Sequence, residues 1–169
     1  MIMKQTLKYI YERLLDNTKI AESKYAITIA LASGVIVFAS GFLSLDSLIG
    51  KTLSAGCIVF ALISVLYGFV ALSAKTIRIP RKKHPKKIKN LMFYKNIIRF
   101  DEHSYVEEIK KRYNFPNAYK PDEFDFDLAR QVISLAKVVY LKFLYFNLSL
   151  VFLILSVICG VVLIILIGL

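Results

Sequence analysis

The stretch that decides the fold is residues 144–169, which read LYFNLSLVFLILSVICGVVLIILIGL and hold no charged side chain. These 26 residues, at about 1.5 Å per residue, are long enough for one tilted helix across a hydrocarbon core of about 30 Å. They are too short for two crossings and a turn. We therefore predict one membrane-spanning helix at the end of the chain, over residues 143–169.

Two further apolar runs lie earlier in the chain and predict a transmembrane hairpin over residues 25–73. Residues 25–45 hold no charged side chain and predict the first span, and residues 52–73 predict the second. The segment between them contains Asp46 and Lys51 and is predicted to be a short turn. The first run is longer than the apolar core of a cleaved signal peptide, about 7 to 15 residues, so we expect it to be retained.

The composition agrees with a membrane protein. The 169 residues are 57% hydrophobic and 21% charged, and the mean hydropathy is +0.58. The net charge of +11 would suit nucleic acid, but 17 of the 23 Lys and Arg residues lie in residues 75–142, between the predicted spans. Cytoplasmic loops concentrate Lys and Arg, so we expect a membrane protein whose N-terminus and central stretch lie in the cytoplasm, whose C-terminus lies outside, and which has no nucleic-acid partner.

Residues 1–24 are predicted to form a cytoplasmic amphipathic helix, because apolar side chains recur at helical spacing. These side chains are Leu7, Ile10, Tyr11, Leu14 and Leu15. Such a helix either packs on the central segment or lies on the membrane surface. We favour packing, since the charges of this segment are mixed rather than purely basic.

Residues 74–142 are predicted to form a cytoplasmic helical module with a polybasic entry. Residues 88–98 and 102–112 are predicted to be helices. The second of these has acidic residues at its start and basic residues at its end, which matches the helix dipole. Residues 114–122 contain two prolines and are predicted to be a loop.

The last helix is predicted to run from about residue 126 through the third span without a break. Asp125 is its predicted N-cap, and no Pro or Gly intervenes between Asp127 and Gly160. Its buried stripe is predicted to be Leu128, Val132, Leu135 and Val139. The fold class is therefore an all-α membrane protein with three transmembrane helices and a cytoplasmic helical module.

Catalysis, metal binding and ion-coupled transport have little support in the sequence. His84 and His103 have no accompanying nucleophile or ligand motif, so we expect no enzymatic activity, no metal and no bound cofactor. Cys57 and Cys159 fall within apolar spans and are expected to be buried thiols. The spans hold no ionisable group for a proton or ion path, and a constitutive pore fits less well because nothing polar is expected to line them.

The basic run at residues 75–89 has eight basic residues and no acidic one. Such a cluster sets topology and attracts anionic lipid, and it can also hold a phosphate-bearing ligand. A membrane scaffold or assembly protein that binds lipid or a protein partner is one function that this run supports. The candidate lipid contacts are Lys82, Lys83, Lys86, Lys87 and Lys89.

Several short stretches occur in the order that is typical of one protein family. They are AESK at residues 21–24, NLMFYKNI at 90–97, YVEEI at 105–109, DLARQVISLAK at 127–137 and KF at 142–143. With these motifs the chain resembles the transmembrane effectors of bacterial Pycsar anti-phage systems. The resemblance implies a homo-oligomeric effector that detects a cyclic pyrimidine nucleotide, cCMP or cUMP, made by a partner cyclase on infection, and then damages the inner membrane.

A cyclic nucleotide carries one phosphodiester charge, so one or two Arg side chains suffice to hold it. An aromatic ring would stack on the base, and an amide would read the edge of the base. The candidate ligand-binding residues are Arg78, Arg81 or Arg99 for the phosphate, Tyr94 or Tyr105 for the stack, and Asn90 or Gln131 for the base edge.

Overall fold

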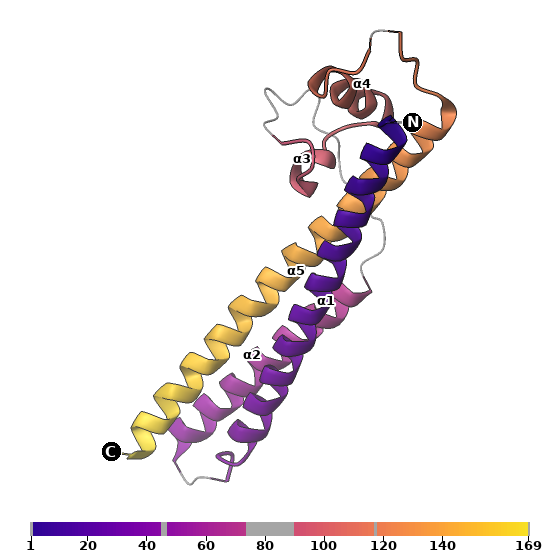
Figure 1. Cartoon of the computed structure of the whole chain (residues 1–169). Coiled ribbons are helices and arrows are strands. Elements are labelled where there is room, and N and C mark those ends of the chain that lie inside the picture. Colours follow the sequence, from indigo (N-terminus) through magenta and orange to yellow (C-terminus); the bar gives the residue numbers. More distant parts are fainter. Residues whose placement is uncertain (1, 45–46, 74–89, 117, 169) are drawn as a thin grey trace. The chain divides into compact units, whose positions relative to one another are not determined.

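The computed structural model describes residues 2–44, 47–73, 90–116 and 118–168. Within these ranges the chain forms helices and no strand, and three of the helices are long and apolar enough to cross a membrane. The predicted all-α membrane class with three spans is confirmed. In chain order (Figure 1) the helices are α1 (Ile2–Ser40), α2 (Leu48–Leu72), α3 (Tyr94–Ile97), α4 (Glu102–Arg112) and α5 (Glu123–Gly168).

The chain divides into two compact units, and α1 and α5 contribute residues to both. The described part of the first, which we call the polar unit, consists of residues 2–20, 90–116 and 118–141. The described part of the second, the membrane unit, consists of residues 21–44, 47–73 and 142–168. The basic run at residues 75–89 lies outside the described residues.

The N-terminal part of α1 packs within the polar unit. Leu7, Ile10 and Leu14 are fully buried, and Lys4 forms an ion pair with Asp122. Buried side chains at every third or fourth position form one stripe, as expected for a helix with a packed face. The structure thus supports packing of this helix over its lying on lipid, and the same helix continues into the first span without a break.

The start of α5 differs from the prediction by a few residues. The helix begins at Glu123, so Asp125 lies inside its first turn and is not the N-cap. The Asp125 N–H donates to Asp122 Oδ1 at 3.0 Å, and the Asp122 N–H donates to Asp125 Oδ2 at 3.1 Å. This reciprocal pair is a capping box, in which Asp122 is the cap and Asp125 stands where Glu or Gln is usual.

The buried face of α5 in the polar unit is also rotated from the predicted stripe. Val132 and Val139 are fully buried as predicted, whereas Leu128 and Leu135 are only half-buried. Ala129, one turn before Val132, and Ala136, between the two valines, are fully buried on the same face, and Ile133 is also buried. Small side chains allow a neighbouring helix to approach closely, so the larger leucines lie at the flanks of the contact.

The helix predicted over residues 88–98 is reduced to the single turn of α3 in the described residues. The Asn90 side chain accepts a hydrogen bond from the Met92 N–H at 2.8 Å, and the Asn90 carbonyl accepts one from Asn96 Nδ2 at 2.8 Å. An Asn that satisfies the backbone two residues ahead favours a turn over a helix. By contrast, α4 has the predicted bounds, and its N-cap Asp101 accepts from the Ser104 N–H at 2.7 Å.

In the membrane unit, α2 buries a stripe made entirely of small residues. The buried positions recur every third or fourth residue: Gly50, Ser54, Cys57, Ala61, Ser64, Gly68 and Ala71. At Gly68 a Cβ would lie 3.1 Å from Ile29 Cγ1 of α1, so the Ile29 side chain would have to shift to accept a larger residue. Small residues let helix backbones approach in lipid, where no hydrophobic force draws the helices together.

Hydroxyl and thiol groups join α2 to α5 across this stripe. Ser64 Oγ donates to the Ser149 carbonyl, and Ser149 Oγ donates to the Ser64 carbonyl, each at 2.8 Å. One heptad away, Ser156 Oγ donates to the Cys57 carbonyl at 2.7 Å, and Cys57 Sγ lies 3.2 Å from the Ser156 carbonyl. We call these two reciprocal pairs the hydroxyl seam. These polar groups lie within the spans and are buried between the two helices.

Candidate functional site

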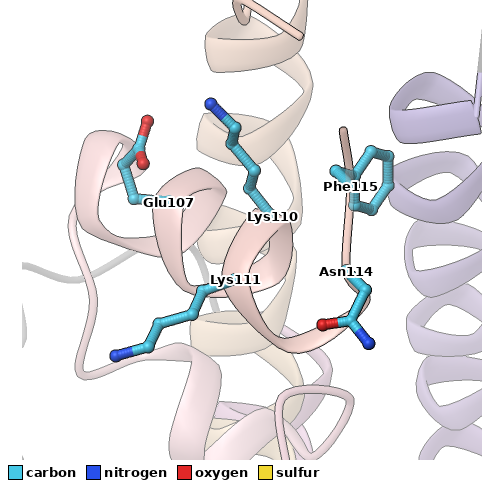
Figure 2. A pocket seen from close by; sticks show the side chains of 5 residues that line it. All are labelled: Glu107, Lys110, Lys111, Asn114 and Phe115. Atoms are coloured by element: carbon cyan, nitrogen blue, oxygen red, sulfur yellow. The ribbon is translucent and has the colours of Figure 1, made fainter. Parts of the chain in front are cut away.

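One face of α4 borders a cavity of about 340 Å³ in the polar unit. Glu107, Lys110, Lys111 and Asn114 follow one another at helical spacing along this face, and Phe115 lies beyond the end of the helix (Figure 2). The opposite face of α4 is the packed one, where Tyr105, Val106 and Ile109 are fully buried. The cavity is therefore lined by the outward-facing side of a helix whose inner side is packed.

The end of α4 places Asn114 and Phe115 at the cavity through a defined backbone turn. Asn114 has a φ of 50°, a left-handed conformation that Asn tolerates better than most residues. The Phe115 N–H then donates to the Lys110 carbonyl at 3.1 Å, which is the six-to-one bond of a Schellman motif. Phe115 is nearly buried, and its ring lies 5.8 Å from the ring of Tyr119.

The cavity is electropositive. Lys110 and Lys111 form no ion pair within the described residues, whereas the next residue, Arg112, pairs with Glu108 at 3.4 Å. Glu107 contributes one carboxylate to the same lining, and it too has no ion-pair partner in the described part of the chain. Two ammonium groups and one carboxylate leave the lining with a net positive charge.

A second polar cluster surrounds the N-terminus of α5. Lys4 Nζ donates to Asp122 Oδ2 at 2.7 Å, and this hydrogen bond raises the pKa of Lys4 and lowers the pKa of Asp122. The Tyr119 hydroxyl donates to Asp125 Oδ2. Burial, followed by this bond to a carboxylate, raises the pKa of Tyr119. Asp125 Oδ1 is buried and has no hydrogen-bond partner in the described residues.

A third cluster lies where α1 and α5 enter the membrane unit. The Lys142 ammonium is almost fully buried and pairs with Glu22 at 2.5 Å. The Lys142 carbonyl accepts a hydrogen bond from the Tyr25 hydroxyl, and Lys24 lies over the ring of Phe143 at 5.7 Å. A buried ammonium is costly unless it is paired, so this pair fixes which turns of the two helices face each other.

The structure describes five of the residues predicted to bind the nucleotide: Asn90, Tyr94, Arg99, Tyr105 and Gln131. Tyr105 is fully buried and its hydroxyl donates to the Leu91 carbonyl at 2.8 Å, so its ring is part of the packing. Tyr94 is half-buried, and burial raises its pKa. Asn90, Arg99 and Gln131 are exposed, and neither they nor the two tyrosines line the α4 cavity.

The remaining candidates from the basic run lie outside the described residues. They are Arg78 and Arg81 for the phosphate, and Lys82, Lys83, Lys86, Lys87 and Lys89 for lipid. The cavity residues were missed because Lys110 and Lys111 were interpreted only as charges that complement a helix dipole. Their spacing with Glu107 and Asn114 on one polar face was the available signal.

The family model for the Pycsar effector protein domain matches residues 6–169. The match includes both the polar unit and the membrane unit. The chain belongs to this family. It is thus an effector of an anti-phage defence system rather than a cyclase, and in such a system the signal is a cyclic pyrimidine nucleotide from a partner cyclase. The three apolar helices and the family together indicate a membrane location. No curated protein and no solved structure matches the chain.

Proposed function

We propose that this Pycsar effector binds cCMP or cUMP on its polar unit and then impairs the integrity of the inner membrane through its three spans. The observation that carries the proposal is the single family match over residues 6–169, which joins a charged helical unit to a membrane unit in one effector domain. The polar unit can bind a soluble signal, and the membrane unit lies in the bilayer. This division suits a protein that converts the binding of a signal into a change in the bilayer.

The proposal includes an orientation and an assembly. The polar unit lies in the cytoplasm, where a cyclase releases its product, and the C-terminus lies in the periplasm. Copies of the chain associate in the membrane as a homo-oligomer. No chemical reaction is assigned to the effector, because its proposed output is a conformational or packing change.

Two measurements on the full-length effector test the proposal. In detergent micelles, isothermal titration with cCMP, cUMP, cAMP and cGMP should detect one pyrimidine nucleotide that binds at least about tenfold more tightly than the purines, equivalent to about 1.4 kcal/mol. In dye-loaded vesicles the same nucleotide should trigger leakage. Leakage without nucleotide would instead indicate a constitutive pore, and binding to anionic vesicles with neither nucleotide binding nor leakage would indicate a lipid scaffold.

A further inference from the structure

The α4 cavity is of a size that suits a single small ligand. Its volume of about 340 Å³ is at the lower end of the range of about 300 to 1,000 Å³ that is usual for ligand sites. One nucleotide fits such a volume better than a dinucleotide or a peptide. Its lining is mostly polar or charged, and Phe115 supplies the aromatic surface.

The charge of the lining matches a monoanion. Lys110 and Lys111 are uncompensated by ion pairs in the described residues, and Glu107 offsets one of them. A cyclic phosphodiester carries a single negative charge, and lysine ammonium groups bind phosphate oxygens as point charges. A nucleoside triphosphate carries several more negative charges than this lining could neutralise.

The remaining lining residues suit a base and a sugar. The Asn114 amide offers a donor and an acceptor together, which is the pattern that a pyrimidine edge requires. Phe115 is 9% exposed, so the uncovered part of its ring offers a base an apolar contact. Glu107 accepts hydrogen bonds only and so favours a hydroxyl or an exocyclic amino group of the ligand.

The C-terminal end of a helix carries partial negative charge, which opposes an anion. Here the Schellman turn uses the Lys110 carbonyl for the Phe115 N–H, and three basic residues end the helix. Attraction for an anion therefore depends on the ammonium groups and not on the backbone. Removing either ammonium group at the cavity is then expected to have a large effect.

We propose that the α4 cavity is the nucleotide site of this effector, with Lys110 and Lys111 toward the cyclic phosphate, Phe115 against the base, and Asn114 and Glu107 toward polar edges of the ligand. This assignment rests on the proposed function and names the residues that perform its binding step. It places the site away from the basic run at residues 75–89.

The test is titration of cCMP and cUMP into full-length effector in detergent, for the parent and for single variants. Lys110→Gln and Lys111→Gln remove one charge each and should weaken binding about tenfold or more. Lys95→Gln is the matched control, because Lys95 is exposed in the same unit and does not line the cavity; its affinity should stay within about twofold of the parent.

Two further variants distinguish the loss of a ligand contact from the loss of the folded structure. Asn114→Gly keeps the left-handed backbone and removes the amide, since glycine adopts a φ of 50° without strain. Phe115→Leu keeps an apolar side chain and removes the ring. Both should weaken binding, while circular dichroism and the thermal transition stay close to those of the parent.

The possible results divide the two proposals clearly. If the parent binds a cyclic pyrimidine nucleotide and every cavity variant binds it equally well, the site assignment is overturned and the proposed function stands. If the parent binds no cyclic nucleotide, both fall. If Lys110→Gln and Lys111→Gln lose binding only to anionic vesicles, the α4 cavity binds lipid headgroups. If inorganic phosphate competes as well as the nucleotide does, the cavity binds phosphate. Either result overturns the nucleotide assignment.

Discussion

At the residue scale, the Lys4–Asp122 pair ties the start of α1 to the start of α5 within the polar unit. Both side chains are largely exposed, so the pair is expected to contribute modestly at neutral pH. Asp122 also caps α5, and an acidic cap is favourable at a helix N-terminus. Its carboxylate therefore stabilises the folded polar unit in two ways that both require the charged form.

The first prediction is a pH dependence of Asp122→Asn. Because the folded state lowers the pKa of Asp122 from its ordinary 3.8, its contribution is present above that value and is lost as the pH falls through the lower folded pKa. Lys4 has its pKa raised above 10.5, so its contribution is lost only as the pH rises past the folded value. The parent should unfold at a higher temperature than Asp122→Asn near pH 7, and the gap should close as the pH falls below the ordinary pKa of 3.8 and through the lower folded pKa. A gap that is unchanged in acid would contradict the ionic role.

The second prediction compares two neighbouring leucines of α1. Leu14 is 1% exposed and Leu15 is 36% exposed. If α1 packs within the polar unit, Leu14→Ala should lower the free energy of unfolding by about 2 to 5 kcal/mol, and Leu15→Ala by much less. Denaturant titration of the full-length protein in detergent measures both. Equal costs would mean that this part of α1 has no packed face.

The Leu135 side chain was predicted to be in the core but is only half-buried. The expected stability cost of Leu135→Ala is therefore smaller. Leu135→Ala should now cost less than Leu14→Ala, because a half-buried side chain loses less buried area and leaves no closed cavity. The sequence could show that α5 has an apolar face. It could not show that Ala129 and Ala136 are buried on that face, because alanine is compatible with both buried and exposed positions.

At the scale of elements, the long helices and α4 were predictable and α3 was not. The unbroken α5 followed from the lack of Pro and Gly over residues 127–159, and the bounds of α4 followed from its charged ends. Residues 90–93, just before α3, do not form the predicted helix, because the Asn90 side chain accepts a hydrogen bond from the backbone N–H two residues ahead. Apolar periodicity does not detect such competition.

The candidate site was harder to predict than the helices around it. Lys110 and Lys111 have an ordinary structural explanation as charges at the end of a helix, and nothing in their spacing alone requires a cavity. The cavity depends on the left-handed Asn114, which directs Phe115 back to the lining. A single left-handed residue is set by local backbone energetics that the sequence pattern does not reveal.

The third prediction concerns the register of α2 against α5. Cys57 Sγ lies 3.4 Å from Ser156 Oγ, so a cysteine at that position should form a disulfide with Cys57 under mild oxidation. The variant Ser156→Cys is made in a Cys159→Ala background. Cyanogen bromide cleaves the chain after Met92. The two large fragments of the monomer should stay joined until the disulfide is reduced. The fragments hold α2 and α5, respectively.

The matched control is Ser149→Cys in the same background. Ser149 faces Ser64, one heptad from Cys57, or about 10 Å along α2. That distance is beyond the reach of a disulfide. Efficient linkage of Cys57 to the residue at 149, or none to the residue at 156, would show that the hydroxyl seam has another register in the membrane.

At the scale of the whole molecule, charge is distributed unevenly along a chain that crosses the membrane three times. Five Lys and Arg precede the first span, one lies in the turn between the first two, and 17 lie in residues 75–142 before the third. Basic residues close to a span are retained on the cytoplasmic side. Three crossings then place the two ends of the chain on opposite sides.

The fourth prediction is this topology, tested with a reporter enzyme that is active only in the periplasm. Fusions after Leu169 and after Ser47, the N-cap of α2, should be active, and a fusion after Lys120 should be silent. A cytoplasmic reporter should give the opposite pattern at each position. Activity of the periplasmic reporter after Lys120 would put the polar unit outside the cell, away from any nucleotide made by a cytoplasmic cyclase. The α4 cavity would then have no access to the signal, and the proposed function would fail together with the topology.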